Sequence, residues 1–348
     1  MNFKISSSQE RLSLNIESVA AIITKIQLET GEIPWSINGH TDPWDHIESI
    51  MGLTIGGHIE NARKGFEWLL NNQLERGAWY SSYRKGVPDD KTLDTNMTSY
   101  IAVGAFHHYL ITKDKNYLHS LWPSIKKAID FSISLQAPTG AFYWAESPQG
   151  VVDQMSLLTG SSSIFMSLKC ALSIAGILHQ QEPGWKAAKN KLLDAIQYHP
   201  HLFNVTKSRF SMDWFYPILS GALTGEAAYK RIDKYWKKFV VDGLGVRCVS
   251  DEPWITLAET SEFVLALAAM GNYPLAKIIF SWIQDRCYDD GTCWCGFTFP
   301  NMIIWPEDKM SWTNGVALMA ADALYEITPA SRLFSHQFWE ESEFSQFV

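Results

Sequence analysis

Apolar residues recur along this chain at spacings of three and four, the pattern of helices that bury one face. Residues 61–72 (NARKGFEWLLNN) and 99–111 (SYIAVGAFHHYLI) both show it. Strand-like alternation is almost absent. We predict helices over residues 8–27, 43–54, 57–73, 94–112, 114–136, 157–180, 185–199, 211–223, 225–239, 256–270, 273–287 and 311–326, and a weaker one over 332–342.

The predicted helices fall into pairs. Within a pair the connection is short, as at Thr112–Lys113 and Gly271–Asn272, whereas the connections between pairs are long and rich in Gly, Pro and aromatic residues. Short loops join antiparallel neighbours, and long loops carry function. We therefore predict an all-α fold, an (α/α)6 toroid of about six helical hairpins with its long loops at one end. No linker divides the chain, so we expect one domain over residues 1–348.

A glutamine followed by Gly and Trp recurs where helices are predicted to end. One copy is Gln73, Gly77 and Trp79, and related copies begin at Gln27, Gln136 and Gln284. A glutamine side chain can bond to backbone carbonyls left free at a helix end or to neighbouring loop groups, and glycine permits the turn. The tryptophan can cover apolar surface. We expect these copies to be structural.

Composition narrows the partners and the compartment. The net charge is −8 with no basic run, which excludes a general nucleic-acid binder. The first residues lack a signal-peptide pattern, and no segment approaches a span of about 20 apolar residues. Five scattered cysteines indicate reduced thiols rather than a disulfide framework. We expect a cytoplasmic protein without membrane insertion.

Acidic and aromatic residues gather at the predicted N-terminal ends of the inner helices. They are Asp42, Trp44, Asp45, His46 and Glu48, then Asp94 and Asn96, Ser161 to Ser163, Asp213 and Trp214, Trp254 and Glu259, and Trp305 and Trp312. On a toroid these residues converge on one open end. Aromatic faces stack on sugar rings, and glycoside hydrolysis requires one carboxylic acid and one carboxylate. The set favours a glycan or a small-molecule sugar as substrate.

The order of the helices suggests roles for the acids. In a ring of six, the second and fifth inner helices face each other, so Asp94 opposes Glu259; by the same rule Asp45 opposes Asp213. We expect Glu259 to protonate the leaving group and Asp94 or Asp45 to activate water, while the other residues position the sugar. Asp94 and Asp42 also stand where helix N-caps belong.

Other constellations have plainer interpretations. The string HTDPWDH, residues 40–46, has metal-ligand residue types but is short and interrupted by proline. Cys293 and Cys295 lack the C-x-x-C spacing of zinc sites. We expect no metal and no cofactor. His107 and His108 lie inside an apolar helix, where packing is the favoured role; a sugar isomerase that uses one of them is a third option.

Two resemblances add to this reading. Residues 64–79 (KGFEWLLNNQLERGAW) resemble the QW motif of terpenoid cyclases and prenyltransferases, which is a mark of toroids. Most of the chain, including GEIPWSINGHTDPWDHIE and WPEDKMSWTNGVALMAADAL, resembles a bacterial prenyltransferase-like toroid family that is also similar to six-hairpin glycosidases. The resemblance implies the toroid and leaves two kinds of activity open.

The catalytic motifs of prenyl chemistry are missing from the sequence. The Asp-x-Asp-Asp of class II cyclases does not occur, and Asp290 and Cys293 are one residue too far apart for the Asp-x-Cys zinc pair of protein prenyltransferases. A carbohydrate-active enzyme of six-hairpin glycosidase type is therefore the favoured interpretation. An enzyme acting on an isoprenoid and a non-catalytic module that binds a glycan or a lipid-linked sugar are the alternatives.

Overall fold

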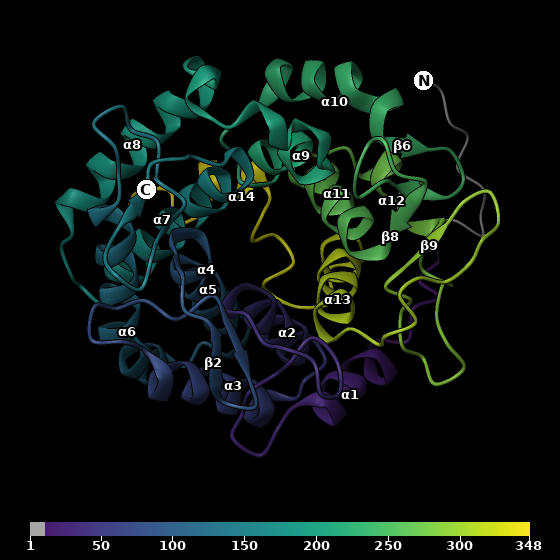
Figure 1. The fold of residues 1–348 in the computed structure, drawn as a ribbon, viewed down its shortest axis with the longest axis horizontal. Helices are drawn as coiled ribbons and strands as arrows, with labels where there is room; N and C mark the ends of the chain where they lie inside the picture. The colour runs from purple at the N-terminus through teal and green to yellow at the C-terminus, as the bar shows by residue number, and fades with distance from the viewer. Residues whose placement is uncertain (1–10) are drawn as a thin grey trace.

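Two concentric rings of helices form the protein, shown in Figure 1 as a computed structural model that describes residues 11–348. Each inner helix packs on the next, and α13 packs on α2, which closes the ring and confirms the (α/α)6 toroid. The inner helices are α2 (Pro43–Ile55), α4 (Thr95–Ser99) continued by α5 (Ile101–Thr112), α7 (Leu158–Ile177), α9 (Ser211–Leu219), α11 (Leu257–Ala269) and α13 (Ser311–Tyr325).

The outer ring differs from the inner ring in its pattern of burial. All residues of α11 are buried, because an inner helix is covered on every side. In the outer helix α10 only the stripe Ala228, Ile232, Trp236 and Phe239 is buried. The outer helices are α1 (Ile16–Ile26), α3 (Ile59–Asn72), α6 (Lys115–Ser134), α8 (Pro183–Tyr198), α10 (Gly225–Phe239) and α12 (Tyr273–Ser281).

Most predicted helices are present, with shifted ends. The helix expected from residue 8 begins at Ile16, where the Asn15 side chain accepts a hydrogen bond from the Ser18 N–H; residues 1–10 of that prediction lie outside the described part. The helix expected over 94–112 is divided at Tyr100, whose backbone stays in the right-handed helical region, so α4 and α5 run on as one inner element. The helix expected to reach residue 287 ends at Ser281.

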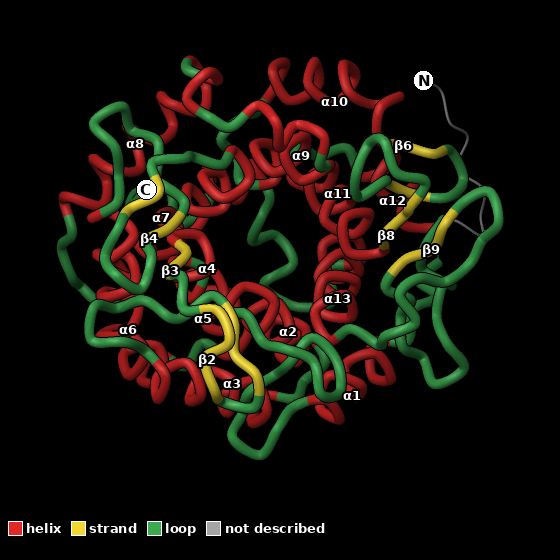
Figure 2. Tube along the Cα trace, in the orientation of Figure 1, coloured by secondary structure: helices red, strands yellow, loops and turns green. Residues whose placement is uncertain are grey.

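Short antiparallel strands lie in the connections, and Figure 2 shows them among loops rather than in either ring. The pairs brace the segments that lead into the inner helices. They are β1 (Ser82–Arg84) with β2 (Val87–Asp90), β3 (Leu93–Asp94) with β4 (Ala145–Glu146) and β5 (Val152–Asp153), β6 (Val240–Val241) with β7 (Gly245–Val246), and β8 (Trp254–Thr256) with β9 (Gly296–Thr298).

The recurring glutamines join neighbouring outer helices. The Gln73 amide donates to the Gly77 carbonyl at 2.7 Å and to the Ser124 carbonyl of α6 at 2.9 Å. We call this arrangement an outer joint; Gln27 makes it with Gly31 and Asn61, and Gln136 makes it with Gly140 and Ala188. The indole N–H of Trp79 donates to the Leu69 carbonyl and its ring is buried. The structural role expected for this pattern is confirmed at Gln27, Gln73 and Gln136, whereas the side-chain oxygen of Gln284 accepts the Ser13 N–H at 3.1 Å.

Glycine is required at the outer joints for two reasons. Gly31, Gly77 and Gly140 all have φ between +91° and +98°. A Cβ atom on Gly77 would lie 2.3 Å from the carbonyl oxygen of Lys127 in α6, and Gly31 and Gly140 meet the next outer helix in the same way. No side chain fits between the loop and that helix, so the repeat fixes how closely successive outer helices approach.

The C-terminal segment packs against the other end of the ring. The rings of Trp339 and Phe344, in and after α14 (His336–Glu341), lie 5.9 and 5.0 Å from the ring of Phe106. His336 bonds to the Ile218 carbonyl near the C-terminal end of α9. The long loops therefore occupy the opposite end, where the inner helices begin.

Among the described helices, α7 alone is long and apolar enough to cross a membrane. Of its most apolar window, 83% is buried inside the protein. Since α7 packs against α5, α8 and α9, its apolar character is that of a helix buried in the inner ring.

Candidate active site

Three acids of α2 lie on one face of the helix at its N-terminal end: Asp42, Asp45 and Glu48, each three residues from the next. Asp42 is the N-cap, and its carboxylate accepts the backbone N–H of Asp45 at 3.0 Å and the indole N–H of Trp35 at 2.5 Å. These bonds explain why a buried acid is tolerated there. Burial nevertheless raises the pKa of Asp42.

Asp45 is only partly buried as a residue, and its carboxyl lies among other acids. Burial of the carboxyl raises its pKa well above the ordinary value, and the negative charges of Asp42, Glu48 and Glu262 add to the rise. A hydrogen bond with Asp42 favours the protonated form of Asp45 as well. The raised pKa favours the protonated form of Asp45, which is the form that a general acid needs.

Glu48 lies one turn deeper on α2 than Asp45. Its carboxyl accepts the indole N–H of Trp44 at 3.0 Å and the hydroxyl of Tyr100 at 3.5 Å. Burial raises its pKa to about 8, assisted by the charges of Asp42 and Glu259. The ring of Trp44 lies 5.7 Å from the ring of Tyr100 and 5.6 Å from that of Tyr216.

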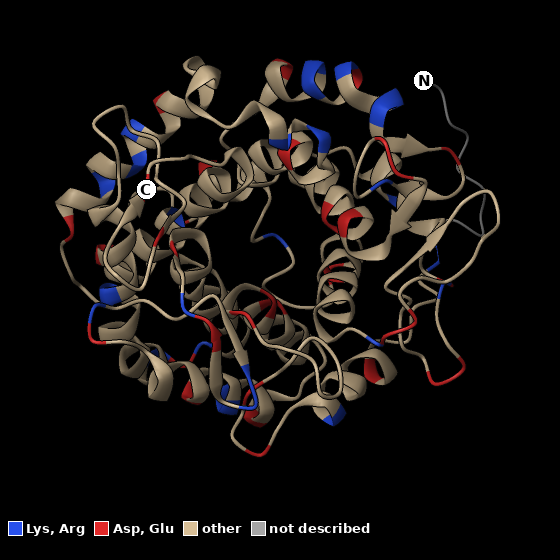
Figure 3. Ribbon diagram, in the orientation of Figure 1, with Lys and Arg blue, Asp and Glu red and all other residues tan. Residues whose placement is uncertain are grey.

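Helix α11 contributes the acids that face those of α2. Glu259 is buried and one of its carboxyl oxygens has no hydrogen-bond partner. Glu262, one turn further, accepts the hydroxyl of Tyr216. Burial raises the pKa of Glu262 well above the ordinary value, and the charge of Glu48 is the next largest cause. Figure 3 shows acidic residues of α2 and α11 on the inner side of the ring.

The acids are thus brought together differently from the prediction. Helix α13 separates α2 from α11, so the acids whose charges act on one another between helices lie two positions apart in the ring rather than opposite each other. Asp45 does not pair with Asp213. We call Asp42, Asp45, Glu48, Glu259 and Glu262 the acid cluster.

Asp94 and Asn96 lie beside the acid cluster at the start of α4. The Asp94 carboxylate caps the helix by accepting the Met97 N–H at 2.9 Å, and burial raises its pKa to about 6. The carbonyl oxygen of the Asn96 side chain is buried without a partner. Both residues line a cavity of about 120 Å³ together with Trp44 and Ser161. The capping role of Asp94 is compatible with a place in the site.

Of the remaining predicted tryptophans, Trp254 and Trp305 lie in the connections between helices and Trp312 lies at the start of α13. The indole N–H of Trp254 donates to the Trp305 carbonyl at 2.8 Å, and their rings lie 5.0 Å apart. Trp305 is 56% exposed. The ring of Trp312 lies 5.8 Å from that of Trp35, and its indole N–H is buried without a partner. These rings offer aromatic surface near the starts of α11 and α13.

Three predicted site residues bond to neighbouring helices or loops instead. His46 accepts the Ile33 N–H at 3.1 Å and bonds to the Gly65 carbonyl at 3.0 Å; burial lowers its pKa to about 4. Asp213 accepts the Thr159 N–H at 3.2 Å and the hydroxyl of the same residue. Trp214 stacks between Phe239 and Phe263. His46 and Trp214 thus pack an inner helix against an outer one, and Asp213 joins the inner helices α9 and α7.

Glu262, Tyr216 and Tyr100 were not expected from the sequence. Glu262 lies three residues after Glu259, and this spacing places two residues on one helix face, so the sequence carried a usable signal for it. The tyrosines lie inside apolar helices, where nothing local distinguishes a ring that packs from a hydroxyl that bonds to an acid.

The other candidate groups lie elsewhere. The ring of His108 contacts Phe66 and Tyr117 of the outer ring, and His107 is buried beside it, away from the acid cluster. Within residues 11–348, no group of three or more His, Cys, Asp or Glu side chains is arranged to hold a metal ion. The five cysteines are free thiols.

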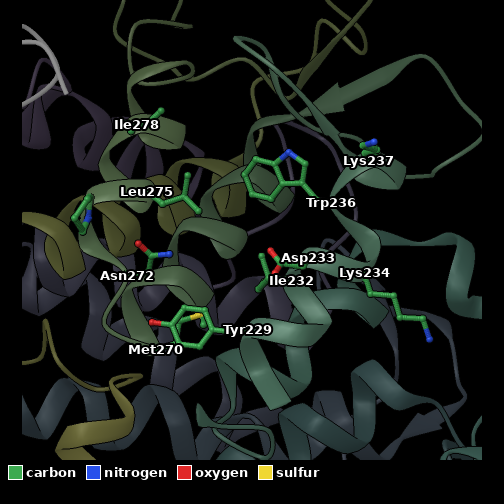
Figure 4. Close-up of a pocket in the computed structure, with 11 residues that line it drawn as sticks. Tyr229, Ile232, Asp233, Lys234, Trp236, Lys237, Met270, Asn272, Leu275 and Ile278 are labelled. Carbon is green, nitrogen blue, oxygen red and sulfur yellow. The ribbon is translucent and has the colours of Figure 1, made fainter. Parts of the chain in front are cut away.

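A larger cavity, of about 540 Å³, opens between the outer helices α10 and α12. Figure 4 shows Tyr229 and Trp236 of α10 and Leu275 and Ile278 of α12 around it. None of the acid cluster reaches this groove. The size of a cavity therefore does not identify the candidate active site in this protein.

Solved structures with the same ring are enzymes of sugar chemistry. A glycosidase matches 94% of this chain and 100% of its own with a TM-score of 0.67 and 14% identity. A D-mannose isomerase matches 93% of this chain and 99% of its own with a TM-score of 0.69 and 12% identity. A sugar epimerase from a ruminal bacterium matches 90% and 97% with a TM-score of 0.64 and 13% identity. At such identities the likeness concerns the fold.

The ring and its acid cluster define a glycosidase-type enzyme of the six-hairpin fold. At the level of sequence, the chain is 44% identical over 315 residues to the MMP endo-(1,4)-3-O-methyl-alpha-D-mannosidase of Mycolicibacterium hassiacum, over 90% of this chain and 87% of that one. The chain belongs to the family of that mannosidase. No protein-family model matches it. The prenyltransferase side of the resemblance receives no support from these relatives, and the hydrolase interpretation stands.

Proposed function

We propose that this protein is an endo-acting α-mannosidase that cleaves (1→4) bonds between 3-O-methylated mannose residues. The observation that carries the proposal is the meeting of acids from α2 and α11 at the inner-helix starts, where burial and neighbouring negative charges raise the pKa of Asp45. The substrate class is supported by the 44% identity to an enzyme named for this activity.

In the proposed reaction Asp45 transfers its proton to the glycosidic oxygen as the bond from that oxygen to C1 breaks. Water adds to C1, and Glu259 takes up the proton that the water loses. These roles exchange the ones predicted for the two residues. Asp45 suits the acid because burial and neighbouring charges raise its pKa, and Glu259 suits the base because one buried oxygen has no other partner.

Glu48 and Glu262 support this arrangement from one turn deeper. Their charges contribute to the raised pKa of Asp45, and Trp44, Tyr100 and Tyr216 fix their carboxyl groups. The Trp44 ring adjoins both the acids and the cavity at Asp94, so a sugar ring that stacks on it lies between them. We also propose a cytoplasmic location, supported by the five free cysteines.

The test is digestion of an α-(1→4)-linked oligomer of 3-O-methylmannose, with products separated by size. Internal cleavage into shorter oligomers is expected. Asp45→Asn should lower kcat by about 10²–10⁴-fold, the range for loss of a general acid. The wild-type rate should also fall as pH rises through the raised pKa of Asp45, because the acid then loses its proton.

The matched control is Asp322→Asn. Asp322 is also a buried aspartate of an inner helix, and burial raises its pKa to about 6, but it bonds to Thr328 at the far end of α13. This variant should keep kcat. Binding of the oligomer without cleavage by the folded wild type would instead indicate a glycan-binding module and overturn the proposal.

A further inference from the structure

Three residues that line the cavity of about 120 Å³ beside Asp94 have buried side-chain polar atoms without a hydrogen-bond partner. The side-chain carbonyl oxygen of Asn96 and the hydroxyl of Ser161 have no partner, although these residues are only 5% and 2% exposed. The indole N–H of Trp144 is buried and unpaired as well. A buried polar group without a partner costs about 1–3 kcal/mol, so a bound group that paired with any of these three would be stabilised at this cavity.

The rest of the cavity wall is hydrocarbon. Phe142, Leu157 and Ile164 line it, and the rings of Trp44 and Trp144 border it. Phe142 and Ile164 are each 1% exposed. The volume is smaller than the about 300–1,000 Å³ of a complete ligand site, so the cavity fits part of a larger molecule. That part has an apolar group and a few hydrogen-bonding atoms.

A methylated sugar edge has this combination. Its methyl group favours an apolar wall, and its ether oxygen can only accept a hydrogen bond, which Trp144 or Ser161 can donate. A free hydroxyl on the adjacent carbon can donate to the Asn96 oxygen. An unmethylated sugar would place a hydroxyl against Phe142 and Ile164, where it finds no partner.

We propose that this cavity is the subsite that recognises the 3-O-methyl group of a mannose bound next to the acid cluster, an inference that rests on the proposed function. The Trp44 ring forms one wall of the cavity and bonds to Glu48, so a sugar held there lies beside the acids. The cavity thus selects the methylated polymer.

The experiment compares kcat/KM on two α-(1→4) mannose oligomers of equal length, one methylated at O3 and one not. The wild type should prefer the methylated oligomer by about 10-fold or more, the effect of a methyl group in a fitted apolar pocket. Leu157→Trp fills the cavity and should reduce the ratio to about 1, mainly by slowing the methylated oligomer.

Three further variants make the result specific. Leu158→Trp is the matched control: Leu158 is partly buried like its neighbour but lines a different cavity, so the ratio should persist. Gly160→Leu is a second way to fill the cavity if Leu157→Trp does not fold, since a Cβ there meets only ordinary contacts at 3.5 Å or more. Asn96→Ala should slow both oligomers by about 3- to 10-fold and leave the ratio unchanged.

Affinity is measured in parallel by calorimetry with Asp45→Asn and its double variant with Leu157→Trp. A preference for the methylated oligomer that Leu157→Trp removes supports the subsite even where no cleavage occurs, which would overturn only the proposed function. Equal kcat/KM for both oligomers in the wild type, with equal affinities, would overturn the subsite and leave the mannosidase activity intact.

Discussion

The outer joints and the inner-helix starts both contain polar side chains, but they differ in how far those side chains are hydrogen-bonded within the protein. At an outer joint, the Gln73 amide donates to two carbonyls and Gly77 lies directly against α6, so the polar atoms are paired and the space is filled. At the inner-helix starts, Glu259, Asn96 and Ser161 are buried with unpaired oxygens, and several acids lie within reach of one another's charge.

This difference separates architecture from function. A paired, filled contact gains its free energy within the protein, whereas an unpaired buried acid is unfavourable unless something else binds it. Changes at the outer joints should therefore lower stability and leave the chemistry intact. Changes in the acid cluster should lower activity and leave stability unchanged or higher, which is the trade-off expected of active sites.

The largest stability effect is expected from Gly77→Ala. The substitution imposes a positive φ on a residue with a Cβ atom and drives that atom into the Lys127 carbonyl, so the free energy of unfolding should fall by about 2–4 kcal/mol. Denaturant titration measures it. Gly57→Ala is the control, because Gly57 has φ +79° but open space around it; this variant should lose only about 1 kcal/mol.

A smaller loss is expected from Gln73→Ala, which leaves the Gly77 and Ser124 carbonyls without their donor. The free energy of unfolding should fall by about 1–3 kcal/mol while kcat/KM stays unchanged. Gln181→Ala, at an exposed position, should change neither quantity. A loss of activity in Gln73→Ala without a loss of stability would erase the distinction between the two regions.

A further prediction concerns the dependence of stability on pH. Folding raises the pKa of Glu48 from 4.5 to about 8, so its contribution to stability is present below the lower value and is lost as pH rises through the upper one. Wild-type stability should decline from pH 5 to pH 8, and Glu48→Gln, which does not titrate, should decline less. Thermal unfolding at several pH values tests this. An equal or steeper decline in the variant would contradict it.

The helices of the two rings and the structural role of the outer-joint residues could be predicted from the sequence, because both depend on local chemistry. Apolar spacing gives a helix and its buried face, and the Gln73, Gly77 and Trp79 pattern supplies a donor, a turn and a cover within seven residues. The expectation that Asp45 and Glu259 lie at the starts of inner helices is also confirmed.

What the sequence could not supply was the direction of each side chain within the ring. Trp214 and Asp213 lie at an inner-helix start as expected, yet they point to α10 and α7 because those neighbours offer an aromatic stack and hydrogen-bond donors. Tyr216, two residues after Trp214, reaches Glu262 instead. Such choices arise from packing between helices far apart in the chain.

The most direct test measures the stability and the activity of Glu259→Gln together. Because the substitution removes one charge from a crowded set of acids, the account predicts a large loss of kcat/KM on the methylated oligomer with unchanged or increased free energy of unfolding. A variant that loses stability but retains kcat/KM would show that Glu259 serves the fold, and would contradict the account.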